Sequence, residues 1–132
     1  LIKNKGITIY FENNKSIKAV YDEDRIIQVL TNLLSNAIKF CPDVDGLITI
    51  TIADKIDFWE ISVMDNGKGI NPVDFENIFD KFYQSDNQNI KKPVGSGLGL
   101  AICKQIVELH HGKIWAQNNN GAGACFIFTL PK

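Results

Sequence analysis

Amide side chains that could hold a metal ion recur along one predicted helix. Gln28, Asn32, Asn36 and Lys39 follow one another at intervals of four, four and three residues, so they share one helix face. Asparagine disfavours helix interiors because its side chain competes for backbone hydrogen bonds, so two of them in mid-helix are a local cost. A carboxamide oxygen can ligate Mg²⁺, and an ammonium group one turn further can meet a phosphate oxygen. Taken alone, this helix supports a metal site and a solvated polar face about equally.

A carboxylate at the end of a predicted strand forms a second motif. Asp65 follows an apolar segment and precedes Asn66-Gly67-Lys68-Gly69, which must turn. Glycines supply positive φ angles and let the backbone approach a ligand closely. A buried carboxylate here could accept a hydrogen bond from the exocyclic amine of adenine. The alternative is an ordinary turn, which sequences of this type often form.

A glycine-rich segment, Gly95-Ser96-Gly97-Leu98-Gly99-Leu100, opens a second predicted helix. Free N–H groups and the helix dipole favour anions at such a position. The segment lacks the GxxxxGK[ST] spacing of a P-loop, and it does not follow a strand as a dinucleotide fingerprint does. It could also be a hinge, and the polar stretch before it fits both interpretations. The three motifs together indicate an ATP site: amides for a metal, a carboxylate for adenine and a helix start for phosphates.

The segments between these motifs predict a sheet covered by helices. β-branched and aromatic residues indicate strands at 7–11, 47–53, 58–64, 113–117 and 124–130. Apolar residues at helical spacing predict a helix from Glu23 to Phe40, with Asp22 as its N-cap and Cys41-Pro42 as its end. A second helix is expected at 98–111 with Gly112 as its C-cap, and one or two short helices between Pro72 and Phe82. Strands that arrive in pairs favour a two-layer α/β sandwich with a mixed, mostly antiparallel sheet and helices on one face.

Composition narrows the remaining possibilities. The 132 residues suffice for one domain with its own core. A formal charge of −1 gives no footprint for a nucleic acid or an anionic membrane surface, and no apolar run approaches the roughly 20 residues that span a bilayer. Cys41, Cys103 and Cys125 lack zinc-ligand spacing and are expected to be reduced thiols. The chain begins in a strand-like pattern without Met, so a longer parent protein is expected.

Five motifs in this order resemble the catalytic, ATP-binding domain of sensor histidine kinases, in the superfamily that includes DNA gyrase and a heat-shock chaperone. The resemblance covers nearly the whole chain and implies the Bergerat ATP-binding fold over residues 1–132. The motifs are an N box, a first glycine box, a phenylalanine box, a second glycine box with its helix, and a closing glycine box with the final strand: RIIQVLTNLLSNAIKF, DNGKGI, IFDKFYQSD, GSGLGLAICKQIVELHHGKI and GAGACFIFTLP.

The resemblance implies that two of these motifs hold Mg²⁺ and the phosphates. Asn36 would ligate Mg²⁺, Asn32 would support the metal and phosphate region, and Lys39 would contact phosphate. Asn32 and Asn36 would be the residues nearest the chemistry. The second glycine box would hinge a lid and contact phosphate through Gly95, Ser96, Gly97, Leu98, Gly99 and Leu100.

The first glycine box would form the adenine pocket, and the phenylalanine box would anchor the lid. Asp65 would bind the adenine amine, in a pocket shaped by Gly67, Gly69 and Ile70. The lid would occupy about residues 83–97, and Phe79 and Phe82 would anchor it. The family often has Thr near the adenine where this chain has Cys125. A thiol is a weak hydrogen-bond partner, so the resemblance implies a changed water network around Asp65.

One position separates two chemistries within the superfamily. Hydrolysing members carry a glutamate, acting as a general base, where this chain has Asn32. An amide cannot activate water in that way, so the resemblance points to phosphoryl transfer to a protein, with ADP as the product. Catalysis would then consist mostly of positioning and charge neutralisation. A hydrolysing ATPase and a non-catalytic nucleotide-sensing or scaffold module remain as alternatives.

The resemblance also implies partners that lie outside this domain. The γ-phosphoryl group would go to a histidine on a separate dimerisation domain of the same protein, and then to an aspartate of a response regulator in a two-component pathway. His110 and His111 end the second predicted helix and are not expected to be the acceptor. The parent protein is expected to be a homodimer and this domain alone a monomer. The domain is expected to face the cytoplasm, whether or not its parent is anchored in the membrane.

Overall fold

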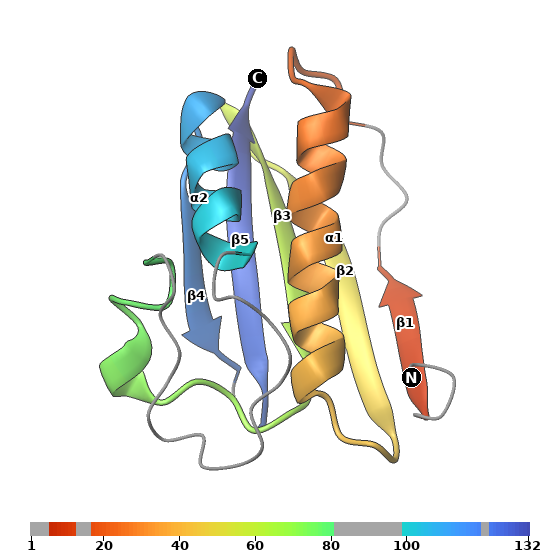
Figure 1. Cartoon of the computed structure of the whole chain (residues 1–132). Helices are drawn as coiled ribbons and strands as arrows, with labels where there is room; N and C mark the ends of the chain where they lie inside the picture. Colours follow the sequence, from red (N-terminus) through yellow and green to blue (C-terminus); the bar gives the residue numbers. More distant parts are fainter. Residues whose placement is uncertain (1–5, 13–16, 81–98, 120–121) are drawn as a thin grey trace.

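A mixed sheet of five strands forms one layer of the fold, and two helices lie side by side across one of its faces (Figure 1). The computed structural model describes residues 6–12, 17–80, 99–119 and 122–132. The elements are β1 (Ile7–Phe11), α1 (Glu23–Phe40), β2 (Gly46–Asp54), β3 (Phe58–Asp65), the 3-10 helix η2 (Pro72–Asp74), α2 (Gly99–Leu109), β4 (Ile114–Asn118) and β5 (Ala124–Pro131).

The strand order is β1-β2-β3-β5-β4. β1 runs parallel to β2, and the other neighbouring pairs are antiparallel. β5 enters between β3 and β4 and is buried along nearly its whole length. The predicted two-layer α/β sandwich with a mixed, mostly antiparallel sheet is therefore confirmed.

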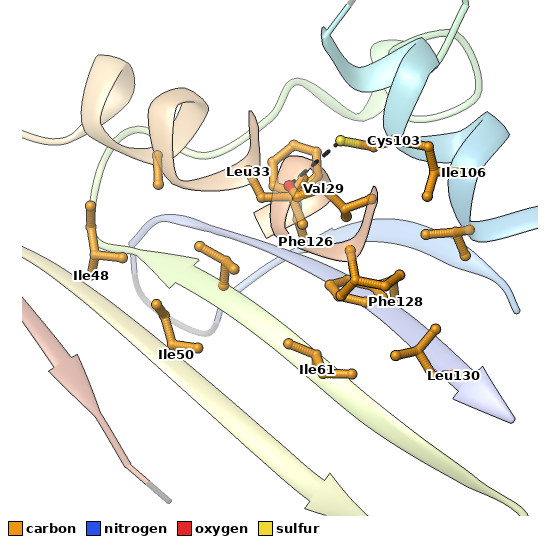
Figure 2. Packing of buried hydrophobic residues seen from close by; sticks show 14 of the residues in the cluster. Val29, Leu33, Ile48, Ile50, Ile61, Cys103, Ile106, Phe126, Phe128 and Leu130 are labelled. Carbon is orange, nitrogen blue, oxygen red and sulfur yellow. Dashed lines mark hydrogen bonds between the residues drawn. The ribbon is translucent and has the colours of Figure 1, made fainter. Parts of the chain in front are cut away.

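The core lies between the helices and one face of the sheet. α1 buries Ile26, Val29, Leu33 and Ala37, which recur every three or four residues. Figure 2 shows Val29 and Leu33 of α1 together with Cys103 and Ile106 of α2 above Phe126 and Phe128 of β5. The side chains of β3 alternate between buried and half-buried, and its last buried position is Asp65. The strand alternation thus carries a carboxylate to the helix-covered face.

The predicted ends of α1 are also confirmed. The Asp22 carboxylate accepts a hydrogen bond from the Arg25 N–H at 3.3 Å, as an N-cap does. Cys41, which precedes Pro42, has the extended angles φ −68° and ψ 149° and ends the helix. Because both ends of α1 are defined, the positions of Asn32 and Asn36 along the helix are defined as well.

The predicted end of α2 is wrong in one respect. The left-handed residue is His111, with a φ of 65°, and not Gly112. Gly112 N–H donates to the Val107 carbonyl and His111 N–H to the Glu108 carbonyl, each at 2.9 Å, which is the Schellman pattern. Gly112 is required for another reason: a Cβ there would lie 2.0 Å from the Thr129 carbonyl oxygen of β5. Close approach to the sheet, rather than a positive φ angle, explains this glycine.

The segment after β3 contains one 3-10 turn, Pro72–Asp74, where one or two short helices were predicted. The Asn71 side chain caps it by accepting from the Val73 N–H at 3.2 Å. The predicted lid, together with Phe82 and Leu98, lies outside the described residues. In the ranges that are described, neither helix has the length and apolar character needed to cross a membrane.

Candidate nucleotide-binding site

Asp65 provides a buried hydrogen-bond acceptor at the end of β3. Its side chain is only 5% exposed. One carboxylate oxygen accepts from the Gly67 N–H at 2.8 Å and from the Ala124 N–H at 3.3 Å. Burial raises the pKa of Asp65 above its ordinary value of 3.8, and the two backbone hydrogen bonds oppose that rise. The carboxyl group is therefore held in one orientation between β3, the following loop and β5.

The loop after Asp65 lies directly against the end of α1. A Cβ on Gly67 would lie 2.1 Å from the Phe40 carbonyl oxygen, so only glycine permits this contact. The Asn66 side chain ties the same loop to the start of β2, accepting from the Leu47 N–H at 2.8 Å and donating to the Asp45 carbonyl at 3.0 Å. The sequence analysis had assigned no role to Asn66. These contacts bring the Asp65 motif to the helix that carries the asparagines.

The asparagine face of α1 meets the first turn of α2. Asn32 and Asn36 are half-buried, and Lys39 is exposed in the last turn of the helix. The Asn32 amide donates to the Gly99 carbonyl at 3.4 Å. A Cβ on Gly99 would meet nothing nearer than the Asn32 side chain, at 4.0 Å. The start of α2 therefore lies beside the Asn32 amide of α1.

Cys103 joins the two helices just behind Asn32. Its thiol donates to the Val29 carbonyl at 3.7 Å, the contact drawn as a dashed line in Figure 2. The same thiol is hydrogen-bonded to the Asn32 side chain. Burial raises the pKa of Cys103 to about 11, so the group is a neutral thiol near pH 7. The prediction of reduced thiols agrees with the structure, in which Cys41, Cys103 and Cys125 are free.

Several other predicted site residues lie around the same corner. Ile70, Phe79 and Leu100 are partly buried against the core. The Phe79 ring meets the Phe126 ring edge-on, with centroids 6.2 Å apart. The predicted contacts outside the described residues are Phe82, Gly95, Ser96, Gly97 and Leu98.

Cys125 lies on the wrong face of β5 to contact Asp65 directly. It pairs with Met64 across the sheet and is hydrogen-bonded to Ser62, whereas the neighbouring Phe126 pairs with Val63 on the helix-covered face. The group of β5 that reaches the Asp65 carboxylate is the Ala124 N–H. Burial, followed by the nearby charge of Asp65, raises the pKa of Cys125 to about 11. The expected effect of this thiol on an adenine water network therefore lacks a structural basis.

Two asparagines to which the sequence analysis assigned no role contact the Asp65 loop. The Asn118 oxygen accepts from the Ile70 N–H at 2.7 Å, and its amide donates to the Ile70 carbonyl at 2.9 Å. The Asn119 amide donates to the Asp65 carbonyl at 2.9 Å. The run Asn118-Asn119-Asn120 directly after a strand was the available signal, because asparagine side chains readily bond nearby backbone.

A separate cavity of about 430 Å³ lies at the opposite end of α1, lined by Asp22, Arg25, Ile102, Gln105, Ile106, Leu109 and His110. His110 accepts from the Asp22 N–H at 2.9 Å through Nε2, and its Nδ1 lies 2.9 Å from the Ile106 carbonyl oxygen. Nε2 thus connects the end of α2 to the N-cap of α1, whereas the Nδ1 contact stays at the C-terminal end of α2. This cavity therefore lies away from the Asp65 carboxylate and from the asparagine face of α1.

The raised pKa of Asp65 predicts a measurable effect on stability. Below pH 3.8 the carboxyl group is protonated in both the folded and the unfolded chain. As the pH rises through the raised value, the unfolded chain loses this proton first, so the free energy of unfolding falls. Asp65→Asn lacks this titration and keeps an oxygen for both backbone hydrogen bonds. We therefore expect its stability relative to the unmutated chain to increase as the pH rises towards neutrality. Urea unfolding of both proteins across this range measures the difference, and a constant difference would contradict the prediction.

Comparisons with known proteins show the family to which this chain is similar. A family model described as "Histidine kinase-, DNA gyrase B-, and HSP90-like ATPase" matches residues 21–132. The sensor histidine kinase WalK of Bacillus subtilis (strain 168) is 45% identical over 112 residues, which are 83% of this chain and 18% of WalK.

Solved structures show the same architecture. The nucleotide-free catalytic domain of the histidine kinase ThkA matches with a TM-score of 0.84 and 37% identity, over 99% of this chain and 84% of that one. ThkA in complex with the response regulator protein TrrA matches with a TM-score of 0.79 and 36% identity, over 99% of this chain and 36% of that one. This chain therefore spans only a small part of its curated relative WalK, but nearly all of a catalytic domain.

Proposed function

Because this chain belongs to the histidine kinase-, DNA gyrase B- and HSP90-like ATPase family, we propose that it binds Mg-ATP and supplies the γ-phosphoryl group in a sensor histidine kinase. The observation that carries this proposal is the position of Asn32. It lies beside the first turn of α2 and donates its amide to the Gly99 carbonyl. A general base for hydrolysis would be needed at that point, and an amide cannot be one.

The residues at this corner divide the recognition of ATP between them. Asp65 accepts from the adenine amine, and Gly67 lets its loop approach the end of α1. Gly99 and Leu100 present the start of α2 to the phosphates beside Asn32. The Asp65 motif therefore selects the base, and the start of α2 orients the phosphates.

Asn36 fits magnesium through the chemistry of its donor atom. Within the described ranges no group of three or more His, Cys, Asp and Glu side chains could hold a metal ion. A carboxamide oxygen combined with phosphate oxygens is a suitable donor set for Mg²⁺, which takes few ligands from the protein. When bound, the ion neutralises charge on the phosphate oxygens. Lys39, exposed one turn further, adds a positive charge at the same helix end.

The acceptor and the next partner lie outside this chain. A histidine nitrogen of a dimerisation domain in the parent protein would form the bond to the γ-phosphorus as the bond to the ADP oxygen breaks. A response-regulator aspartate would then take the phosphoryl group, and the complex of ThkA with TrrA supports a partner of this class. The parent would be a homodimer, with this domain monomeric and on the cytoplasmic side.

A scaffold role without catalysis is the first alternative. Cys125 is the departure from the family that hints at this role, and its thiol is on the face of the sheet away from Asp65. A hydrolysing ATPase would be indicated by steady phosphate release from this chain alone, which the proposal does not expect.

Calorimetric titration of ATP, with Mg²⁺ and again with excess EDTA, tests the site directly. We expect saturable binding that strengthens with Mg²⁺. Asn36→Ala should lose most of that strengthening, about tenfold or more in affinity, by analogy with the 10- to 100-fold losses seen when groups that support a metal are removed. Ser35→Ala, an exposed neighbour on α1, is the control and should behave as the unmutated chain. Equal Mg²⁺ dependence in Asn36→Ala would rule out its role as a ligand.

A further inference from the structure

The loop that follows Asp65 is held by side chains at the end of β4, the edge strand on the other side of β5. Asn118 ends β4, and Asn119 follows it at the turn towards β5. The two amides contact both ends of the loop, Asp65 at its start and Ile70 at its end. These contacts join Asn118 to Ile70, which are 48 positions apart in the chain, and Asn119 to Asp65, which are 54 positions apart.

The Asn118 amide is fully matched to the Ile70 backbone. Its oxygen accepts from the Ile70 N–H at 2.7 Å while its nitrogen donates to the Ile70 carbonyl at 2.9 Å. These two hydrogen bonds run in opposite directions, so they fix both the position and the orientation of the Ile70 backbone. Gly69 makes room for this amide: it has a φ of +87°, and a Cβ there would lie 2.9 Å from the Asn118 oxygen. The second glycine of the Asp65 loop is thus explained by the asparagine it faces.

Asn119 holds the other end of the loop at the backbone of Asp65. Its amide donates to the Asp65 carbonyl at 2.9 Å, and its own N–H donates to the Gly123 carbonyl at 2.9 Å. Gly123 in turn packs closely on the Asp65 carbonyl group, because a Cβ on Gly123 would lie 1.8 Å from the Asp65 carbonyl oxygen. The β4–β5 turn therefore fixes the peptide that carries the carboxylate.

We propose that Asn118 and Asn119 are positioning residues for adenine recognition. They hold the 65–70 loop at both ends, so that the Asp65 carboxylate meets the exocyclic amine of the base at hydrogen-bonding distance. This inference rests on the proposed role of Asp65. A displacement of a binding group by about 1 Å can cost on the order of 100-fold, so the loss of one of several anchors should cost about tenfold.

The experiment compares ATP with inosine triphosphate, in which a carbonyl oxygen replaces the exocyclic amine. The unmutated chain should bind ATP more tightly than inosine triphosphate. Asn118→Ala should weaken ATP binding about tenfold and inosine triphosphate binding by less than about threefold, so the ratio of the two affinities falls. Asn118→Asp keeps the acceptor for the Ile70 N–H but loses the donor to its carbonyl, and should lie between these two proteins. Gln117→Ala, the exposed amide one residue earlier on β4, should retain the original ratio.

The outcomes separate this inference from the role of Asp65 itself. If Asp65→Asn removes the preference for ATP but Asn118→Ala and Asn119→Ala retain it, the positioning role is wrong and the adenine contact stands. If Asn118→Ala weakens both nucleotides equally, with a matching loss of thermal stability, the asparagine only supports the fold. If Asp65→Asn keeps the full preference for ATP, both assignments fall.

Discussion

Asp65→Asn is expected to lower the affinity for ATP by about 10- to 100-fold while the chain remains folded. The substituted side chain keeps one oxygen for the Gly67 and Ala124 N–H groups. It replaces the other oxygen by an NH₂ group, which would face the adenine amine as donor against donor. A buried donor without a partner costs about 1–3 kcal/mol, and the adenine hydrogen bond is lost as well. Each 1.4 kcal/mol is tenfold in affinity, which gives the expected range.

Calorimetry with ATP measures this change, and circular dichroism confirms that the variant is folded. Asp57→Asn removes the same charge from the exposed turn between β2 and β3 and serves as the control. An affinity within a factor of about two of the unmutated chain would show that Asp65 does not contact the base. With the stability effect described above, the variant should gain stability relative to the unmutated chain as the pH rises towards neutrality and still bind poorly. Such a trade-off is common where a binding site needs a buried charge.

Gly123→Ala is expected to destabilise the fold by about 2–5 kcal/mol. Gly123 has a φ of +100°, and a Cβ there would lie 1.8 Å from the Asp65 carbonyl oxygen and 2.8 Å from the Asn66 Cα. The left-handed backbone adds about 1–2 kcal/mol for a residue with a Cβ, and the forced separation of β3 from β5 adds about 1–3 kcal/mol. Small domains are typically stable by about 5–15 kcal/mol, so this loss is a large share.

Urea unfolding measures that loss, and Gly99→Ala is the matched control. Among the described residues, a Cβ on Gly99 would have only the Asn32 side chain near it, at 4.0 Å, and Gly99 is helical. Its replacement should leave stability unchanged or raise it by up to about 1 kcal/mol. Similar stabilities for the two variants would mean that the contact between Gly123 and Asp65 is relaxed in solution.

The parts of the fold that follow from local patterns were predictable from the sequence. α1 has an amphipathic period, an aspartate N-cap and a proline after its end, and its bounds agree with the prediction. The strands were found by their composition, to within about one or two residues. The end of α2 was missed because Gly112 is required by its close approach to Thr129, which lies in β5 and is distant in the sequence. Local sequence alone cannot distinguish a glycine needed for its φ angle from one needed for close packing.

The candidate site was predictable in its chemistry but not in its supports. Asn32, Asp65 and Gly67 were recognised from residue type and spacing, and the structure brings their segments together. Cys125 was misjudged because adjacent strand residues point to opposite faces, so one position decides which face a thiol meets. The asparagine run after β4 indicates side chains that bond backbone groups, but it does not indicate that their partners are Ile70 and Asp65, which are distant in the sequence.

The position of β5 in the sheet has a consequence for the order of folding. β5 is the last strand along this chain, yet it supplies the central contacts between β3 and β4. During synthesis the earlier strands can pair as β1-β2-β3, but the open edge of β3 and the part of α2 that faces β5 stay uncovered until residues 124–131 have emerged from the ribosome. Core formation is thus coupled to the synthesis of residues 124–131, and the Asp65 carboxylate acquires its contact with the Ala124 N–H only at that step.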